Sequence, residues 1–191
     1  MTENRTATTY VLIFLVLVLL NTALAHFGGV PNPVGLGYPL VYVAVAFMIV
    51  FGLWFGGWGA LAAYLGCFVG SGMLGGLPLT FNLYWSLADL WQVLIPLAVF
   101  RALNEDIELR TQRAIVLFVL FGVLLNNIVG AAWGAGMLAI GGFMLWSDVP
   151  ALFTSWLINN LVVCIVLAPL LLRYATPYIR TRGLLVEGYW K

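Results

Sequence analysis

Six apolar runs, each about as long as a membrane is thick, dominate this sequence of 191 residues. They cover residues 9–27, 38–55, 58–75, 83–102, 113–139 and 151–173. A helix rises about 1.5 Å per residue, so roughly 20 residues cross the hydrocarbon core of a bilayer, which is about 30 Å thick. The composition, 63% hydrophobic and 8% charged, excludes a soluble globular domain. We therefore predict an all-α, polytopic membrane protein with one domain, residues 1–191, made of six transmembrane helices.

Two of these assignments depend on the residues beside the runs. Only Gly56 and Gly57 separate the second run from the third, and one helix of nearly forty residues would overshoot the bilayer. A tight glycine reversal is therefore expected there. The first run follows Arg5 and ends near Ala23 and Ala25, as a signal peptide does, but it is long enough to span. We interpret it as a retained first helix.

The positions of the lysines and arginines predict the orientation of the chain. With six spans and a cytoplasmic N-terminus, one side holds every cationic residue, namely Arg5, Arg101, Arg110, Arg113, Arg173, Arg180, Arg182 and Lys191. Cytoplasmic loops carry such an excess of positive charge. We therefore expect both termini in the cytoplasm and a multi-pass protein of the cell (inner) membrane.

The two longer connections differ in composition. The outer loop at 28–39 is rich in proline and glycine, so it should run irregularly, either capping a pocket or simply joining two helices. The inner loop, NEDIELRTQR at 104–113, mixes acids with arginines and is expected to be a solvated helical extension.

Polar side chains of the predicted helices gather in the half that lies away from the arginines. They are Asn21 and His26 in the first span, Asn82, Trp85, Ser86 and Asp89 in the fourth, Asn126, Asn127 and Trp133 in the fifth, and Trp156, Asn159 and Asn160 in the sixth. The inner halves are almost purely apolar. This asymmetry predicts a water-accessible cavity that opens to the outside and ends near the middle of the membrane.

Asp89 is the residue most at odds with a lipid environment. A carboxylate in a membrane helix costs roughly 2.5–3.5 kcal/mol on insertion scales, so it should face a cavity or a polar partner. Trp85 and Ser86 precede it by four and three residues and share its helix face. Such a stripe could bind a small molecule with a cationic or donor-rich group. The alternative is that Asp89 and the asparagines only hydrogen-bond between helices.

Other conspicuous residues have structural interpretations. Cys67 and Cys164 lie in apolar runs without metal-ligand spacing and are expected to be buried. The small residues at positions 62, 66 and 70 allow close packing, either within the chain or against another membrane subunit. The tryptophans near the predicted interfaces are interpreted as membrane anchors, and they are Trp54, Trp58, Trp146 and Trp190.

Several classes of function find no support in the sequence. One histidine, His26, and one membrane carboxylate are too few for a metal site, so no metal and no cofactor are expected. Ser71 has no suitable base, and no hydrolase, metalloprotease or phosphate-binding motif occurs, so we expect no enzyme. The net charge of +1 gives no reason to expect nucleic acid.

Six short spans, polar residues toward the outside and the hairpin FGLWFGGWGALAAYLGCFVG resemble the substrate-binding S components of energy-coupling-factor (ECF) transporters. The resemblance implies a subunit that captures a small solute, vitamin-like or another micronutrient, from the outer side. It also implies ATP-driven uptake with a membrane partner subunit and cytoplasmic ATPases. The family's docking face often has two alanines four residues apart on the first helix, for which this sequence offers Ala25 and Gly29.

The same resemblance implies a site between the first outer loop and the outer parts of spans four to six. The expected substrate-binding residues are Trp85, Asp89, Asn126, Trp133, Trp156 and Asn159. A second resemblance competes, because SWLINNLVVCIVLAPLLLR is similar to the last helix of MASE-type membrane sensor domains. A third possibility is a structural subunit of a larger membrane complex. The expected partners are a small-molecule ligand, membrane lipid, a membrane partner subunit and cytoplasmic ATPases.

Overall fold

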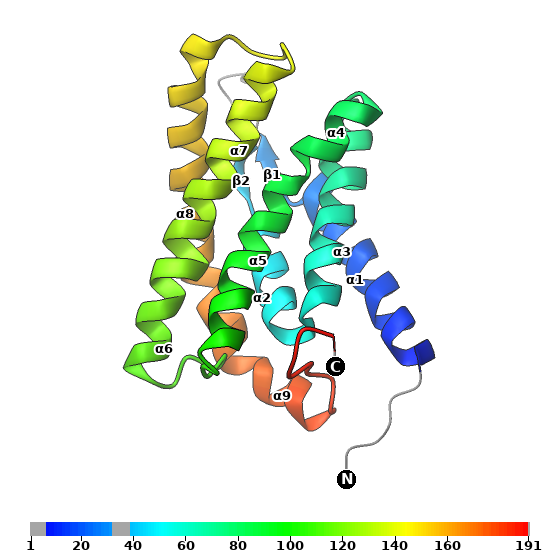
Figure 1. Ribbon diagram of the computed structural model, residues 1–191, viewed down its shortest axis with the longest axis vertical. Coiled ribbons are helices and arrows are strands. Elements are labelled where there is room, and N and C mark those ends of the chain that lie inside the picture. Colours follow the sequence, from blue (N-terminus) through cyan, green and yellow to red (C-terminus); the bar gives the residue numbers. More distant parts are fainter. Residues whose placement is uncertain (1–6, 32–38, 191) are drawn as a thin grey trace.

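Helices make up most of the chain in the computed structural model, which describes residues 7–31 and 39–190 (Figure 1). In chain order the elements are α1 (Ala7–Phe27), β1 (Gly29–Pro31), β2 (Pro39–Tyr42), α2 (Ala44–Phe55), α3 (Gly57–Cys67), η1 (Phe68–Met73), α4 (Leu79–Trp85), α5 (Leu87–Ala102), α6 (Gln112–Leu117), η2 (Phe118–Leu125), α7 (Asn126–Ile140), η3 (Trp146–Asp148), α8 (Val149–Tyr174) and α9 (Thr176–Thr181). The segments η1 and η2 are π-helical and η3 is a 3₁₀ turn. The predicted all-α class is confirmed.

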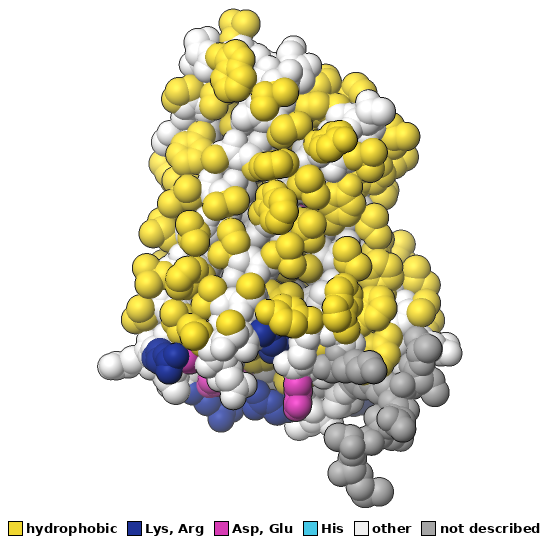
Figure 2. Space-filling model, in the orientation of Figure 1, with side chains coloured by type: hydrophobic (Ala, Val, Ile, Leu, Met, Phe, Trp, Pro, Cys, Tyr) yellow, Lys and Arg dark blue, Asp and Glu magenta, His cyan; other side chains and the backbone are white. Residues whose placement is uncertain are grey.

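Four helical stretches are long and apolar enough to cross a membrane. They are Thr8–Phe27, Leu79–Ala102, Gln112–Ile140 and Trp146–Thr181. Figure 2 shows apolar side chains over most of one face of the molecule, with the arginines and acids gathered at one end. We call this end, where α9 and the α5–α6 connection lie, the charged end. A belt of exposed apolar side chains is what a lipid environment requires, so the protein is a helical membrane protein.

The second predicted span, 38–55, is only partly helical. Residues 39–42 of this span form strand β2, which pairs with β1 in an antiparallel hairpin, with Val30 opposite Val41. Helix α2 begins at Ala44 and has 12 residues, so it is about 18 Å long. Hydropathy alone does not distinguish a buried strand from the start of a helix. The loop proposed to cap a pocket lies mostly at 32–38, outside the described residues.

The predicted glycine reversal between α2 and α3 is confirmed. Gly56 joins the two helices with φ 62° and ψ −135°, a backbone conformation that favours glycine. A Cβ atom at Gly56 would lie 2.4 Å from the carbonyl oxygen of Tyr189. The reversal lets α2 pack in the centre of the bundle, where it contacts α3, α5 and α8.

Helices α1 and α3 pack closely through the small residues that the sequence singled out. A Cβ atom at Gly66 would lie 2.4 Å from Cβ of Asn21, and one at Gly70 would lie 2.9 Å from Cβ of Ala25. Ser71 also donates a hydrogen bond to the Ala25 carbonyl at 3.2 Å. The small-residue face therefore packs within the chain, and Ala25 faces α3 and η1 rather than an outside partner.

Residues 183–190, which we call the C-terminal strap, cross the charged end and hold the α2–α3 turn. Arg101 donates to the carbonyl groups of Leu53, Val186 and Gly188 at 2.9, 2.5 and 3.0 Å. The backbone amide of Gly57 donates to the Tyr189 carbonyl at 2.6 Å. The strap therefore provides a hydrogen-bond acceptor for the backbone at the α2–α3 turn.

Trp54 is not the membrane anchor that its position in the sequence suggested. It is 6% exposed, and its indole donates to the hydroxyl of Thr176 at 2.8 Å. Trp58 and Trp190 contact each other edge to face at 5.4 Å between ring centroids. Trp146 is 64% exposed, as the anchor interpretation expects. Cys67 and Cys164 are both buried, as predicted.

The prediction of a solvated helical extension at 104–113 is wrong over most of its length. The loop has non-helical turns, with φ near 50° at Asn104 and 54° at Leu109. Glu108 is completely buried and forms ion pairs with Arg110 and Arg180. A buried carboxylate between two arginines ties this loop to α9, and composition alone does not reveal that contact.

Candidate functional site

The buried carboxylate of Asp89 lies in the first turn of α5, beside the β1–β2 hairpin. It is 5% exposed and accepts a hydrogen bond from the Tyr42 hydroxyl at 3.0 Å. The Cys67 thiol of α3 lies close to the same carboxylate. Asp89 therefore connects strand β2 with helices α3 and α5. It is held away from lipid, as the cost of a carboxylate in the membrane requires.

Two tryptophans from different helices, one of them four residues before Asp89, face each other. Trp85, the last residue of α4, lies four positions before Asp89, and its ring centroid is 6.1 Å from that of Trp156 on α8. A Cβ atom at Gly134 of α7 would lie 2.7 Å from the Trp156 ring, so this glycine makes room for the indole. The pair forms an apolar wall in the half of the molecule away from the charged end.

Two polar atoms in this region are buried without a hydrogen-bond partner. They are Nε1 of Trp85 and Oδ1 of Asn160. Asn160 is 1% exposed and lies one turn below Trp156 on α8. Buried polar groups are nearly always paired with protein, water or ligand. One donor and one acceptor are therefore free to bind a small molecule or water.

A network of amide side chains lies deeper between α5, α7 and α8. The Gln92 amide donates to Oδ1 of Asn127 at 2.5 Å, and Asn126 donates to the Gln92 carbonyl at 3.3 Å. Asn127 also donates to the sulfur of Cys164 at 3.4 Å. A Cβ atom at Gly130 would overlap Gln92, so the glycine permits this contact. These amides link three helices and form the floor beneath the tryptophan pair.

The six predicted site residues do not all share one surface. Trp85 and Trp156 lie together, Asp89 binds Tyr42 instead, and Asn126 belongs to the floor. Trp133 lies on another side of α7, where its indole donates to the Tyr84 carbonyl at 2.8 Å and its ring contacts Trp91. Asn159 is half-buried, whereas its neighbour Asn160 is the enclosed one. The prediction that these residues bind substrate stays a prediction.

Two contributors were missed at the sequence level. Asn160 follows Trp156 by four residues and precedes Cys164 by four, so helical spacing alone could have singled it out over Asn159. Tyr42 had no such signal, because it lies in an apolar run that was interpreted as helix. Its hydroxyl reaches Asp89 only because the chain there is a strand.

The other polar outer residues are engaged in local contacts. Asn82 donates to the Phe68 carbonyl at 2.7 Å and accepts from the Ser86 hydroxyl at 2.8 Å. His26 has a ring nitrogen 3.1 Å from the Gly70 carbonyl. Within the described residues no three His, Cys, Asp or Glu side chains cluster as metal ligands would.

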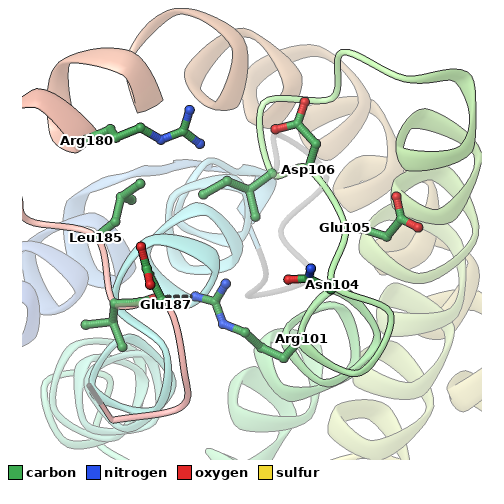
Figure 3. Close-up of a pocket in the computed structure, with 9 residues that line it drawn as sticks. Arg101, Asn104, Glu105, Asp106, Arg180, Leu185 and Glu187 are labelled. Atoms are coloured by element: carbon green, nitrogen blue, oxygen red, sulfur yellow. Dashed lines mark hydrogen bonds between the residues drawn. The ribbon is translucent and has the colours of Figure 1, made fainter.

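A cavity of about 340 Å³ lies at the charged end between the α5–α6 loop, α9 and the strap. Figure 3 shows Arg101 and Glu187 on one side of it and Glu105 and Asp106 across from them. Most of its polar groups already have partners, since Arg101 binds backbone carbonyls and Glu105 pairs with Arg113 at 2.8 Å. Asp106 accepts from two backbone amides of its own loop.

The fold defines the class of this protein as a helical membrane protein. Comparison with known proteins adds no relative, since no family model, curated protein or solved structure matches the chain.

Proposed function

We propose that this protein is a non-catalytic, membrane-embedded binding subunit that captures a small solute from the side opposite the charged end. The proposal places the solute against Trp85, Trp156 and Asn160, beside Asp89. It includes six crossings, in which β2 with α2 and α3 with η1 supply the two that lack a long helix. Both termini are then cytoplasmic, in the inner membrane of a cell.

The strand β2 is the observation that best supports this proposal. Helix α2 ends at the charged end and covers about 18 Å, which leaves roughly 12 Å of a 30 Å hydrocarbon core to be crossed by non-helical chain. Irregular backbone at membrane depth is tolerated where protein buries it or where it lines a water-filled cavity. Strand β2 packs against α8 and brings Tyr42 to the buried carboxylate.

The free donor of Trp85 and the free acceptor of Asn160 support the same location. Ligand sites combine apolar and aromatic walls with a few polar groups that fix orientation. Here the wall is the tryptophan pair, and the unpartnered atoms are Nε1 and Oδ1. The resemblance to S components extends the proposal to delivery of the solute through a membrane partner and cytoplasmic ATPases.

The experiment is native mass spectrometry of the protein purified from the membranes in which it is expressed. We expect a non-covalent adduct of small-molecule mass on the wild type. The adduct should be lost in Trp85→Phe and Asn160→Leu, because each removes one free polar atom and keeps a side chain of comparable size. Asp148→Asn is the matched control, since Asp148 is an exposed carboxylate at the same end as the site.

A structural subunit is the second candidate, and a specific observation favours it. Asp89 has a partner on strand β2, and Asn126 and Asn127 have partners on helix α5, as residues that only hold neighbouring elements together would. This candidate predicts no small-molecule adduct and co-purification with a large membrane complex. Co-purification of ATPases together with the adduct would support the uptake role.

A further inference from the structure

The arginines of the described chain divide into two groups by their contacts. Four have protein partners: Arg101 binds carbonyl groups of Leu53 and the strap, Arg110 and Arg180 share Glu108, and Arg113 pairs with Glu105. The other two, Arg173 and Arg182, are exposed and have no carboxylate partner among residues 7–31 and 39–190. Both lie where α8 and α9 reach the charged end.

Tyrosines accompany these two arginines. Tyr174 and Tyr178 are 76% and 59% exposed, and the guanidinium of Arg182 lies over the Tyr178 ring at 5.1 Å from its centroid. Tyrosine is enriched where a helix leaves the hydrocarbon core, because its ring is apolar and its hydroxyl polar. The arginines therefore lie at the level of lipid headgroups.

An exposed apolar ridge on α8 leads down to this group. Its members follow one another at four-residue intervals and are each at least half exposed: Ile158, Val162, Val166 and Leu170. In the sequence Tyr174, Tyr178 and Arg182 follow at the same interval, across the junction of α8 and α9 at Ala175. From Ile158 to Leu170 the ridge is about 18 Å long, close to the thickness of one leaflet of the hydrocarbon core.

From this arrangement we propose that α8 and α9 form a binding site for one acidic phospholipid of the leaflet at the charged end. The acyl chains lie along the ridge from Ile158 to Leu170. The phosphate accepts hydrogen bonds from Arg173 and Arg182, and the two tyrosine hydroxyls lie at the glycerol level. Guanidinium groups bind phosphate oxygens strongly because the hydrogen bonds are charge-assisted.

The proposal does not depend on solute capture, since no residue of the tryptophan pair or its floor takes part. Basic residues beside membrane helices contribute about 1 kcal/mol each to attraction for acidic lipids. Two arginines on one headgroup should therefore favour an acidic lipid over a zwitterionic one by roughly tenfold or more.

The test is lipid retention measured by native mass spectrometry of the full chain in detergent. The probes are palmitoyl-oleoyl phosphatidylglycerol and palmitoyl-oleoyl phosphatidylcholine at equal concentration. We expect the wild type to retain phosphatidylglycerol about tenfold over phosphatidylcholine. The double variant Arg173→Gln/Arg182→Gln should lose most of this preference, and Arg182→Gln alone should lose part of it.

A second double variant, Arg110→Gln/Arg113→Gln, is matched in charge and lies at the same end, but its arginines are paired with glutamates. It should keep the preference. Equal retention of the two lipids by the wild type would overturn the proposal. Equal loss in the two double variants would overturn it too, because the effect would then reflect the charge of the whole end. A thermal unfolding curve for each variant confirms that it is folded.

Discussion

Replacing Gly56 by alanine should destabilise the protein, because two separate costs meet at this residue. The φ angle of 62° with ψ near −135° is a conformation that costs a non-glycine residue about 1–3 kcal/mol. The new Cβ atom would also lie 2.4 Å from the Tyr189 carbonyl, so the strap must move away. Moving it weakens the hydrogen bond from the Gly57 amide to Tyr189, which contributes about 1 kcal/mol.

We therefore expect Gly56→Ala to lower the free energy of unfolding by roughly 2–4 kcal/mol. The assay is unfolding in mixed micelles, titrated with a denaturing detergent and followed by tryptophan fluorescence or circular dichroism. Gly136→Ala is the matched control, because Gly136 lies within α7 and a Cβ atom there meets nothing within 4 Å. That control should leave stability unchanged or raise it by up to about 1 kcal/mol.

Truncation separates the two costs. In a chain that ends at residue 185, Tyr189 is absent and only the backbone strain remains. The penalty of Gly56→Ala should then fall to about 1–3 kcal/mol, relative to the truncated wild type. The reasoning is refuted if Gly56→Ala is as stable as the wild type, or if its penalty is the same with and without the strap.

Three further changes test other contacts. Gly66→Ala should lower the free energy of unfolding by about 1–3 kcal/mol in the same assay, because its Cβ would overlap Asn21 and push α1 away from α3. An unfolding curve identical to that of the wild type would contradict this packing. Gln92→Leu should lower the free energy of unfolding by about 1–3 kcal/mol, since it leaves Oδ1 of Asn127 buried without its donor. Glu108→Gln should lower the free energy of unfolding by about 1–2 kcal/mol at low salt and by less in 1 M sodium chloride, because salt screens the half-exposed partner arginines. A loss of stability that does not depend on salt would contradict the electrostatic explanation.

The residue that the resemblance to S components suggests for docking is packed inside this chain. The docking residue suggested by the sequence, Ala25, packs against η1, so any partner subunit must meet another face of α1. The exposed face of α1 consists of large apolar side chains, among them Leu12, Val16 and Leu19. A partner helix or lipid can cover such a face equally well, and co-purification distinguishes the two.

The local sequence was sufficient to predict the fold class and much of the helix layout. The span predicted at 113–139 corresponds to a continuous helical stretch at Gln112–Ile140, and Gly56 makes the turn that its position between two apolar runs requires. Hydropathy, run length and glycine conformation are properties of the chain itself. They hold whichever neighbour a helix packs against.

Only the tertiary structure decided which polar group meets which partner. Residues 39–42 form a strand, so that Tyr42 reaches Asp89. Asn160 is buried, whereas its neighbour Asn159 is only partly buried. The tertiary structure also buried Glu108 in a loop that looked solvated. The physical reason is that burying a polar side chain depends on a donor or acceptor supplied by another helix, often far away in the sequence. A pattern of residues along one helix does not contain that partner.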